Sequence, residues 1–476
     1  MSKHMSLFLP LLLTAVMLSG CHQNGASLLP DPAPFVLRPP QCFAHAFQQD
    51  TVALTWVRGD TVAADYIVER KELEKAYAPL CTLKTLATES TFIYGDAGFP
   101  RDSPFQYRIR ASYRGQVSDA VHSFVLMWTE SQMASPLQNT RFDHTATLLP
   151  GGDVLIAGGS SWWQSQTAPC ELYHAASNVW TAAGRLNQER RAHTALLLDD
   201  ASVLIAGGRL TDAHFNSCER YELETRAWQQ AAPMHQPRSD HTAVLLDNGS
   251  VLVSGGHPSN SNYTSGCEIY DTSLDTWRMA DSMETPRAGH ASLVLPDGRV
   301  LVIGGLTVPL HNYGTTTCEL YDPESDVWGT AASLNEARAF FTAHLINHDE
   351  VLVVGGYNGS GSVAGCEIYS ISENRWTATA SLPTGRDHHS AIALDGGNIM
   401  VMGGTAYGCG FFDNSLLFDV KKKIWISTPP LLEVRGFHCA TLLPSGDMLI
   451  TGGITMHNGS QNPALQNELH RFYSND

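Results

Sequence analysis

Histidine recurs at nearly fixed intervals through most of the chain, and its imidazole is the commonest metal ligand among side chains. The six copies, each three residues after an arginine, are His144, His193, His241, His290, His389 and His438. Phe341 takes the place of the histidine after Arg338. Single histidines from separate repeats around a ring cannot converge on one ion, which needs several ligands at about 2 Å. We therefore predict no metal and no other cofactor, and expect these histidines to tie the repeats together by hydrogen bonds.

Residues that are not repeated are better candidates for binding a ligand, because a purely structural role would require them in every copy. Arg209 and Asp240 can make directed hydrogen bonds, and aromatic rings can stack on a sugar or a peptide. Asp143, Asp387 and His388 stand at comparable positions and are expected around the same opening. The residues predicted to contact the ligand are Trp162, Trp163, Arg209, Asp240, His257 and Tyr357.

The repeated histidines and the non-repeated candidate ligand contacts all lie within a repeat of 48 to 51 residues, whose fold must position them. Gly-Gly pairs begin at 158, 207, 255, 304, 355, 403 and 452, and each follows an apolar run such as "VLIAGG" or "VLVSGG". A segment such as "CELY" comes next, and then a tryptophan, at 180, 228, 277, 328, 376 and 425. Each repeat thus predicts four short strands. In an antiparallel unit, the start of the first strand and the residues after Gly-Gly lie at one end, so we expect them to surround one mouth of a channel.

This pattern, including "YDPESDVW" at 321–328, resembles the kelch repeat, whose four-stranded units are the blades of a β-propeller. The resemblance begins near residue 128 and implies seven blades. The seventh repeat ends before its tryptophan, so we expect "FVLMWTESQM" (124–133) to supply its fourth strand and close the ring. The fold class predicted is all-β: a small β-sandwich at 42–123, followed by a seven-bladed kelch propeller at 124–476.

Residues 42–123 carry alternating apolar runs at 52–56, 65–71, 90–96 and 105–115. Trp56 and the alternation of Tyr107, Ile109 and Ala111 resemble a fibronectin type III domain, which implies a spacer or adhesion module. Upstream, the apolar stretch 7–18 ends in Leu18-Ser19-Gly20-Cys21, which resembles a bacterial lipobox. That resemblance implies a signal peptide at 1–21, a lipid on Cys21, a Pro-rich tether at 22–41 and an outer-membrane location. A plain signal peptide or an N-terminal anchor are the alternatives.

Cysteine occupies one equivalent position in five successive repeats, at Cys170, Cys218, Cys267, Cys318 and Cys366. Neighbouring blades hold such positions farther apart than the ~7 Å between Cα atoms that a disulfide allows. We therefore expect small buried hydrophobic residues there. A disulfide between Cys42 and Cys81, and a disulfide or free thiol at Cys409 and Cys439, are left open.

The formal charge of −17 excludes nucleic acid as a partner. We predict an envelope lipoprotein, facing the periplasm or the cell surface, whose propeller mouth binds a glycan or a protein, and we lean against an enzyme. Resemblance to kelch mutarotases leaves a sugar-modifying enzyme as runner-up, with Asp240 and either Arg209 or His257 as its acid–base groups. A galactose-oxidase-like copper enzyme is disfavoured because one of that family's copper ligands comes from a domain after the propeller. A structural protein whose loops cover the mouth is the third class.

Overall fold

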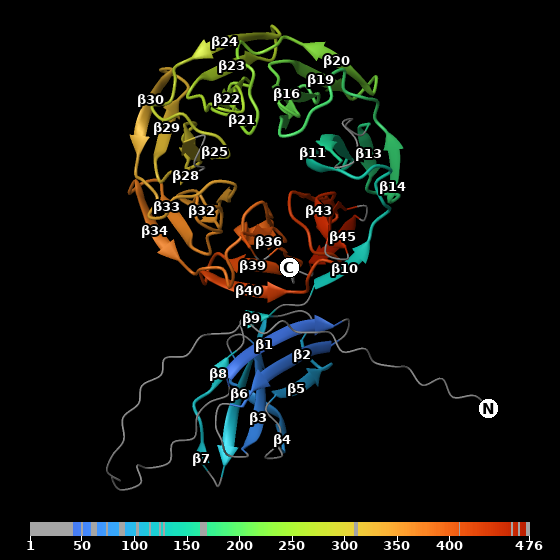
Figure 1. Cartoon of the computed structure of the whole chain (residues 1–476), viewed down its shortest axis with the longest axis vertical. Coiled ribbons are helices and arrows are strands. Elements are labelled where there is room, and N and C mark those ends of the chain that lie inside the picture. Colours follow the sequence, from blue (N-terminus) through green and yellow to red (C-terminus); the bar gives the residue numbers. More distant parts are fainter. Residues whose placement is uncertain are drawn as a thin grey trace, which may run out of the picture.

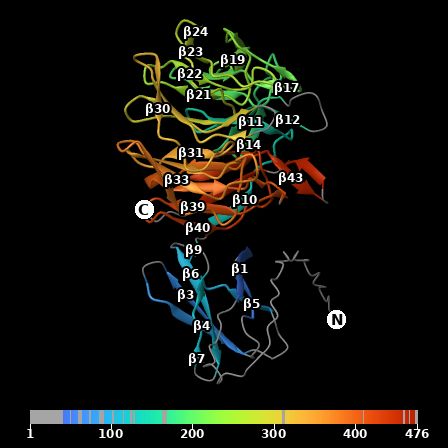
Figure 2. The ribbon, with the colours of Figure 1, turned by 60° about the vertical axis from the view of Figure 1, so that its left-hand side comes forward.

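The computed structural model describes residues 41–48, 51–58, 64–72, 75–84, 91–100, 104–113, 116–122, 125–126, 129–161, 169–308, 313–408, 410–457, 460–464 and 467–472. Strands dominate these residues, so the chain is all-β as expected. A ring of sheets forms one part and a small sandwich the other (Figures 1 and 2). No helix in the described ranges is long and apolar enough to cross a membrane.

Two sheets form the N-terminal sandwich. The first pairs β1 (Gln41–Gln48), β2 (Thr51–Val57) and β5 (Thr91–Asp96). The second contains β3 (Asp65–Glu72), β4 (Ala78–Leu83), β6 (Phe105–Tyr113), β7 (Gln116–Val117), β8 (Val121–His122) and β9 (Val125–Leu126). Trp56 is fully buried between the sheets, as are Tyr107 and Ile109 from β6. The predicted alternation is confirmed, because Arg108 and Arg110 lie on the other face of β6 and bind Glu69.

Seven groups of four antiparallel strands follow around a central channel in the described part of the chain (Figure 1). The first three are β11 (Phe142–Leu148), β12 (Val154–Ser160), β13 (Glu171–His174) and β14 (Val179–Ala182); β15 (Thr194–Leu197), β16 (Val203–Ala206), β19 (Cys218–Glu222) and β20 (Ala227–Ala231); β21 (Thr242–Leu245), β22 (Val251–Ser254), β23 (Cys267–Asp271) and β24 (Thr276–Ala280). The next three are β25 (Ala291–Val294), β26 (Val300–Ile303), β29 (Cys318–Asp322) and β30 (Val327–Ala331); β31 (Thr342–Leu345), β32 (Glu350–Val354), β33 (Cys366–Ser370) and β34 (Arg375–Thr379); β35 (Ser390–Ala393), β36 (Ile399–Met402), β39 (Ser415–Asp419) and β40 (Ile424–Thr428), with the 3-10 turn η1 (Asp395–Gly397) inside the sixth. We number these groups as blades one to six.

The seventh group joins two distant parts of the chain. It contains β41 (Cys439–Leu442), β42 (Asp447–Thr451) and β45 (Glu468–Phe472), and its fourth strand is β10 (Thr129–Met133). Antiparallel pairing of β10 with β45 runs from Thr129 opposite Phe472 to Met133 opposite Glu468. The segment expected to close the ring therefore does so, but only with 129–133. Val125 and Leu126 pair instead in parallel with Ile426 and Ser427 of β40, while Trp128 lies outside the described residues.

Each blade packs on its neighbours through an apolar second strand, and blades one to six also do so through an aromatic pair. Val300, Leu301, Val302 and Ile303 of β26 are all fully buried, because blades cover both faces of the strand. Opposite the third-strand tyrosine, the fourth-strand tryptophan packs at a tilt of 36° to 54°, with ring centroids 4.9 to 5.1 Å apart, and Phe418 replaces the tyrosine in blade six. The indole Nε1 donates to a carbonyl of the preceding blade at 2.7 to 2.9 Å. The repeated tryptophan is thus a contact between blades.

The segments after Gly-Gly, expected as variable loops, form small hairpins in four blades. Their strands are β17 (Arg209–Leu210) with β18 (Ala213–His214), β27 (Leu306–Val308) with β28 (Tyr313–Gly314), β37 (Thr405–Ala406) with β38 (Gly410–Phe411), and β43 (Ile454–His457) with β44 (Ser460–Pro463). The hairpins hold their side chains on a fixed backbone rather than on open loops.

Candidate functional site

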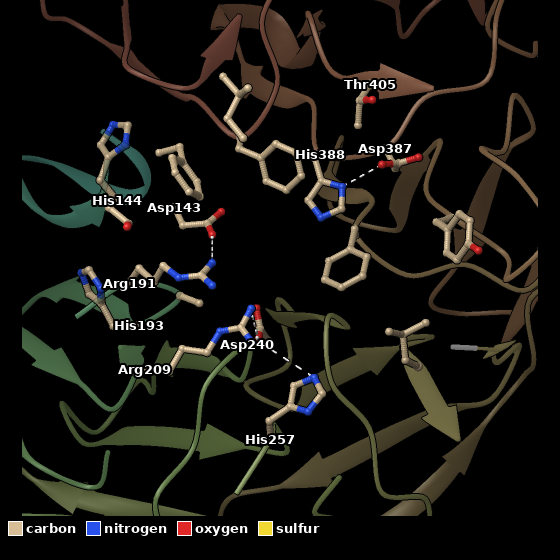
Figure 3. A pocket seen from close by; sticks show the side chains of 18 of the residues that line it. Asp143, His144, Arg191, His193, Arg209, Asp240, His257, Asp387, His388 and Thr405 are labelled. Carbon is tan, nitrogen blue, oxygen red and sulfur yellow. Dashed lines mark hydrogen bonds and ion pairs between the residues drawn. The ribbon is translucent and has the colours of Figure 1, made fainter. Parts of the chain in front are cut away.

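A cavity of about 1300 Å³ lies at one mouth of the channel (Figure 3). Its wall comes from the two places in each repeat that the sequence predicted to meet. Cross-strand pairs join the start of a first strand to the residue after Gly-Gly, as in Arg191 with Arg209 and Ser239 with His257. Ala339 pairs with Tyr357 and Asp387 with Thr405 in the same way. Every blade therefore contributes residues to the wall of one cavity. Blade four contributes only Leu306, which follows its Gly-Gly pair.

The backbone forms a closed ring around this mouth. The residue just before each first strand's histidine, or before Phe341, has a left-handed φ of 48° to 60°. Its N–H donates to the carbonyl of its counterpart in the preceding blade, at 2.9 to 3.4 Å, and Asp143 closes the circuit on Phe437. We call these residues the mouth ring: Asp143, Ala192, Asp240, Gly289, Phe340, His388 and Phe437. A left-handed backbone at a residue other than glycine costs about 1–3 kcal/mol. Six of the seven mouth-ring residues are not glycine, and the hydrogen bonds of the ring hold them in this conformation.

The repeated arginines are structural, as predicted. All seven are fully buried, and each donates to the first carbonyl of its own Gly-Gly pair at 2.6 to 3.1 Å. Six also bind the third-strand glutamate at 2.6 to 2.9 Å. Blade six has Leu416 in place of that glutamate. There burial lowers the pKa of Arg386 to about 10, and its Nη2 has no hydrogen-bond partner among the described residues.

The repeated histidines join neighbouring blades. Nε2 of His193 lies 3.0 Å from the Thr145 hydroxyl of the preceding blade, and four later histidines repeat this contact at 2.6 to 3.1 Å. His144 binds Thr451 at 2.9 Å and so joins the first blade to the last. Burial lowers the pKa of His193 to about 3, because a charged imidazole would lose its hydration. The described residues hold no group of three or more His, Cys, Asp or Glu arranged to bind a metal ion.

Four of the six residues predicted to contact a ligand line the cavity: Arg209, Asp240, His257 and Tyr357. Arg209 Nη2 and His257 Nε2 lie 3.9 and 4.0 Å from Asp240 Oδ2, so these three side chains form one loose cluster. Burial lowers the pKa of His257. The charge of Asp240 opposes this decrease, and the charge of Arg209 adds to it. Tyr357 lies across the cavity beside Tyr407, with ring centroids 6.3 Å apart. Trp162 and Trp163 lie outside the described residues, as does Cys21.

A tighter pair lies next to that cluster in the mouth. Arg191 Nη1 donates to Asp143 Oδ2 at 2.8 Å, and both side chains are about a quarter exposed, at 24% and 21%. Burial, the largest effect, raises the pKa of the Asp143 carboxyl above its ordinary value, and Asp240 adds to this. Arg191 and His388 oppose the rise. Asp143 and Arg191 therefore form a direct ion pair in the mouth, closer than the contacts of Asp240 with Arg209 and His257.

Asp387 and His388 form a third group, which the predicted ligand contacts did not include. His388 Nδ1 lies 2.7 Å from Asp387 Oδ1, and Asp387 Oδ2 accepts a hydrogen bond from the Ser362 hydroxyl. The imidazole stacks between Phe340 and Phe437, with centroid separations of 4.4 and 4.0 Å. These contacts come from three blades. The sequence signal was the doubled histidine at 388–389, where five of the other repeats have a single histidine and the repeat with Phe341 has none.

The five repeated cysteines are buried and reduced, as expected of small hydrophobic residues. Cys81 and Cys439 are also reduced thiols, so neither of the bridges left open by the sequence is formed. Burial raises the pKa of Cys439 to about 12, which makes its thiol unreactive although it lies near the mouth.

Four-stranded blades around a channel, with an arginine and a Gly-Gly pair in each repeat and a tryptophan in six of the seven, define a β-propeller of the kelch type. The Attractin/LZTR1 β-propeller family model matches residues 154–404, more than half of the chain. The protein belongs to that family.

Among solved structures, the chain is similar to a fungal alcohol oxidase of the AA5 family, in complex with copper. The two are 15% identical, with a TM-score of 0.58 over 71% of this chain and 76% of the oxidase, which shows a shared fold. A structure described as YjhT is 16% identical, with a TM-score of 0.47 over 58% of this chain and 98% of that one. A comparison with curated protein sequences finds no match.

Proposed function

We propose that the propeller binds a glycan in the mouth cavity. The observation that carries this proposal is the pairing of two kinds of wall around one space. One wall is aromatic, from Phe340, Phe437, Tyr357 and Tyr407. The other carries Asp143 with Arg191, and Asp240 with Arg209 and His257. Sugar rings present apolar faces to aromatic rings and hydroxyl edges to carboxylates and guanidinium groups.

A cavity of this kind favours a glycan over a folded protein as the ligand. Its volume of about 1300 Å³ suits a short oligosaccharide, while most protein interfaces bury a broad and rather flat surface. Charges of both signs also suit a neutral or weakly charged ligand rich in hydroxyl groups. A protein could enter such a cavity only with a protruding loop.

A glycan array probed with the full-length chain in detergent tests this proposal. Binding should weaken about tenfold or more in Tyr357→Ala and in Asp240→Asn, because each removes a stacking ring or a charged hydrogen-bond acceptor. Tyr313→Ala is the matched control, since Tyr313 is an exposed aromatic residue of the same mouth that does not line the cavity. Absence of any glycan bound above background, or equal loss in the control, would contradict the proposal.

We also propose that the chain is a lipoprotein of the bacterial outer membrane, anchored through Cys21, with the sandwich as a fibronectin-like spacer. The lipobox-like Leu18-Ser19-Gly20-Cys21 and the Pro-rich segment after it support this. Cys21→Ser should leave the chain unprocessed and unlipidated, which mass spectrometry and detergent partitioning would detect. An unchanged mass and unchanged partitioning would contradict the anchor.

A further inference from the structure

The rim of the mouth cavity carries one aromatic ring that the fold leaves uncovered. Tyr407 is 73% exposed, and of the large hydrophobic side chains exposed in the described part of the chain it alone lines the cavity. Single exposed apolar residues are common on protein surfaces and need no function. The neighbours of Tyr407 distinguish it from such residues.

Tyr407 continues an aromatic surface that begins inside the cavity. Its ring centroid lies 6.3 Å from that of Tyr357, and the two ring planes are tilted by 43°. Tyr357 is half-buried, and its hydroxyl donates to the Gly359 carbonyl at 2.9 Å, which fixes the inner ring. At this separation and tilt the rings do not cover each other, so the outer ring keeps a face for a ligand. The pair therefore leads from the cavity out to solvent.

Hydrogen bonds hold the outer ring at the cavity wall. Tyr407 lies at the turn between β37 and β38, and its N–H donates to the Ser362 hydroxyl of blade five at 3.0 Å. The same hydroxyl donates to Asp387, whose backbone pairs with Thr405 of β37. Figure 3 shows Asp387 and Thr405 together at the edge of the cavity. The hairpin of blade six is thus fixed to the wall from both sides, and Tyr407 does not sit on an open loop.

The size of the cavity favours a ligand that reaches both rings. Its volume of about 1300 Å³ exceeds the roughly 300–1,000 Å³ typical of pockets for small molecules. A single sugar that stacks on Tyr357 leaves Tyr407 in water, whereas a second sugar linked to the first can cover it. Successive rings of a glycan chain each present an apolar face, so two neighbouring aromatic rings can stack with two of them.

We propose that the mouth binds a glycan chain and not a single sugar, an inference that rests on the proposed glycan binding. One sugar lies in the cavity against Tyr357, the next stacks on Tyr407, and the rest of the chain leaves over blades five and six. Charged side chains of the cavity, such as Asp240 and Arg209, contact the first sugar and determine which sugar it is. Tyr407 selects for chain length, because stacking on an apolar face does not read individual hydroxyl groups.

The test is the affinity of the full-length chain in detergent for oligosaccharides of increasing length. The probes are chito-, cello-, malto- and manno-oligosaccharides of one to six sugar units, with dissociation constants from isothermal titration calorimetry. In a series that binds, affinity should rise about tenfold from the monosaccharide to the trisaccharide, because one further ring is stacked. Tyr407→Ala should remove most of this rise, so that the two affinities become nearly equal.

Three further variants separate Tyr407 from the rest of the mouth. Tyr357→Ala should weaken the binding of every chain length by a similar factor, since its ring contacts the first sugar. Tyr407→Phe keeps the ring and should keep the rise. The matched control is Tyr313→Ala, which removes an exposed aromatic ring of β28 that does not line the cavity and should change neither affinity. Melting temperatures show whether each variant is folded.

The outcomes distinguish this inference from the proposed function. A series that binds equally well at every length, or a rise that survives in Tyr407→Ala, overturns the chain-length role and leaves glycan binding intact. A Tyr407→Ala variant that weakens the monosaccharide as much as the trisaccharide overturns it as well. If no oligosaccharide of any series binds, both proposals fail.

Discussion

Seven buried arginines in equivalent places allow the contribution of one carboxylate to be measured within a single protein. Arg238 pairs with Glu268, and both side chains are fully buried, whereas Arg386 has no glutamate opposite it. Removing one partner of a buried ion pair leaves the other charge without compensation and costs about 3–5 kcal/mol. We expect Arg238→Leu to lose that much unfolding free energy.

Arg386→Leu should cost clearly less, because it removes a buried cation that is hydrogen-bonded to backbone carbonyls and only more distantly attracted by the Asp413 carboxylate. The loss should be about 1–3 kcal/mol, mainly from the Gly403 carbonyl that Arg386 now satisfies at 2.9 Å. Denaturant unfolding of both variants measures the difference directly. Equal losses would show that the glutamate adds nothing to the role of the arginine.

The histidines between blades predict instability in acid. Burial lowers the pKa of His193 and His438 to about 3, below the value near 6.5 of an unfolded histidine. A lowered pKa means that the unfolded chain takes up protons first, so the stability from the neutral imidazole is complete above pH 6.5 and lost as the pH falls toward 3. At pH 5 each such histidine should have lost about 2 kcal/mol relative to pH 8.

His193→Phe tests this with a ring that the fold already accepts at the equivalent position, where Phe341 is buried. The variant should lose about 2 kcal/mol less than the wild type between pH 8 and pH 5, as measured by urea unfolding at both values. A pH dependence identical to that of the wild type would mean that His193 does not titrate on unfolding.

At the mouth, the sequence predicted which residues line the cavity better than it predicted which side chains contact one another. Arg209, Asp240 and His257 could be predicted because each departs from the repeat at a position that the repeat itself places at the mouth. The Asp387–His388 pair needs Ser362, Phe340 and Phe437, which belong to loops of neighbouring blades. Such contacts depend on the angle between blades and on the room that Gly289 leaves for the Phe340 ring, neither of which a sequence spacing reports.

Strand β10 is the element on which the seventh blade depends. It supplies the outer strand that the last repeat lacks, and its partner β45 would otherwise present unpaired backbone groups. Ser131→Pro combined with Gln132→Pro removes the N–H of two adjacent residues, so at least one loss falls on the side that pairs with β45. We expect a lower melting temperature and aggregation on heating.

Gln116→Pro is the control for this change, since β7 is a two-residue strand at the edge of the sandwich. It should leave the melting of the propeller unaltered. A double variant that melts like the control would mean that β10 contributes nothing to closure.

The elements could be predicted because each repeats. Apolar runs ending in Gly-Gly predicted β12, β16 and their counterparts, since a strand covered on both faces has a nearly continuous apolar sequence. Two features escaped prediction because nothing repeats them. The hairpins after Gly-Gly differ in length between blades. Strand β9 (Val125–Leu126) has no counterpart in the other repeats, so nothing in "FVLMWTESQM" separates it from β10.

At the scale of the whole molecule, β9 makes the sandwich and blade six parts of one ten-stranded sheet. It pairs with Phe105 of β6 on one side and with Ile426 and Ser427 of β40 on the other. Domains joined by linkers alone usually move relative to each other. We expect these two to tumble together, with a single rotational correlation time in NMR relaxation.

Val125→Pro with Leu126→Pro should separate the two parts, because proline cannot donate to a strand ladder. The sandwich should then tumble faster than the propeller while both keep their folds. Gln116→Pro again serves as the control, since β7 lies away from the propeller. Independent tumbling in the wild type itself would show that β9 does not couple the parts.

The mouth ring has an electrostatic consequence for selectivity. All seven of its N–H groups donate to a neighbouring ring carbonyl, so their dipoles follow one another around the circle. Dipoles arranged head to tail in a circle cancel in the plane of that circle. A helix N-terminus does the opposite, because its aligned N–H groups attract anions whatever the side chains are. The N–H groups of the mouth ring are therefore engaged with one another and not aimed at a ligand, so we expect the charged side chains of the mouth to decide which ligand charges it favours.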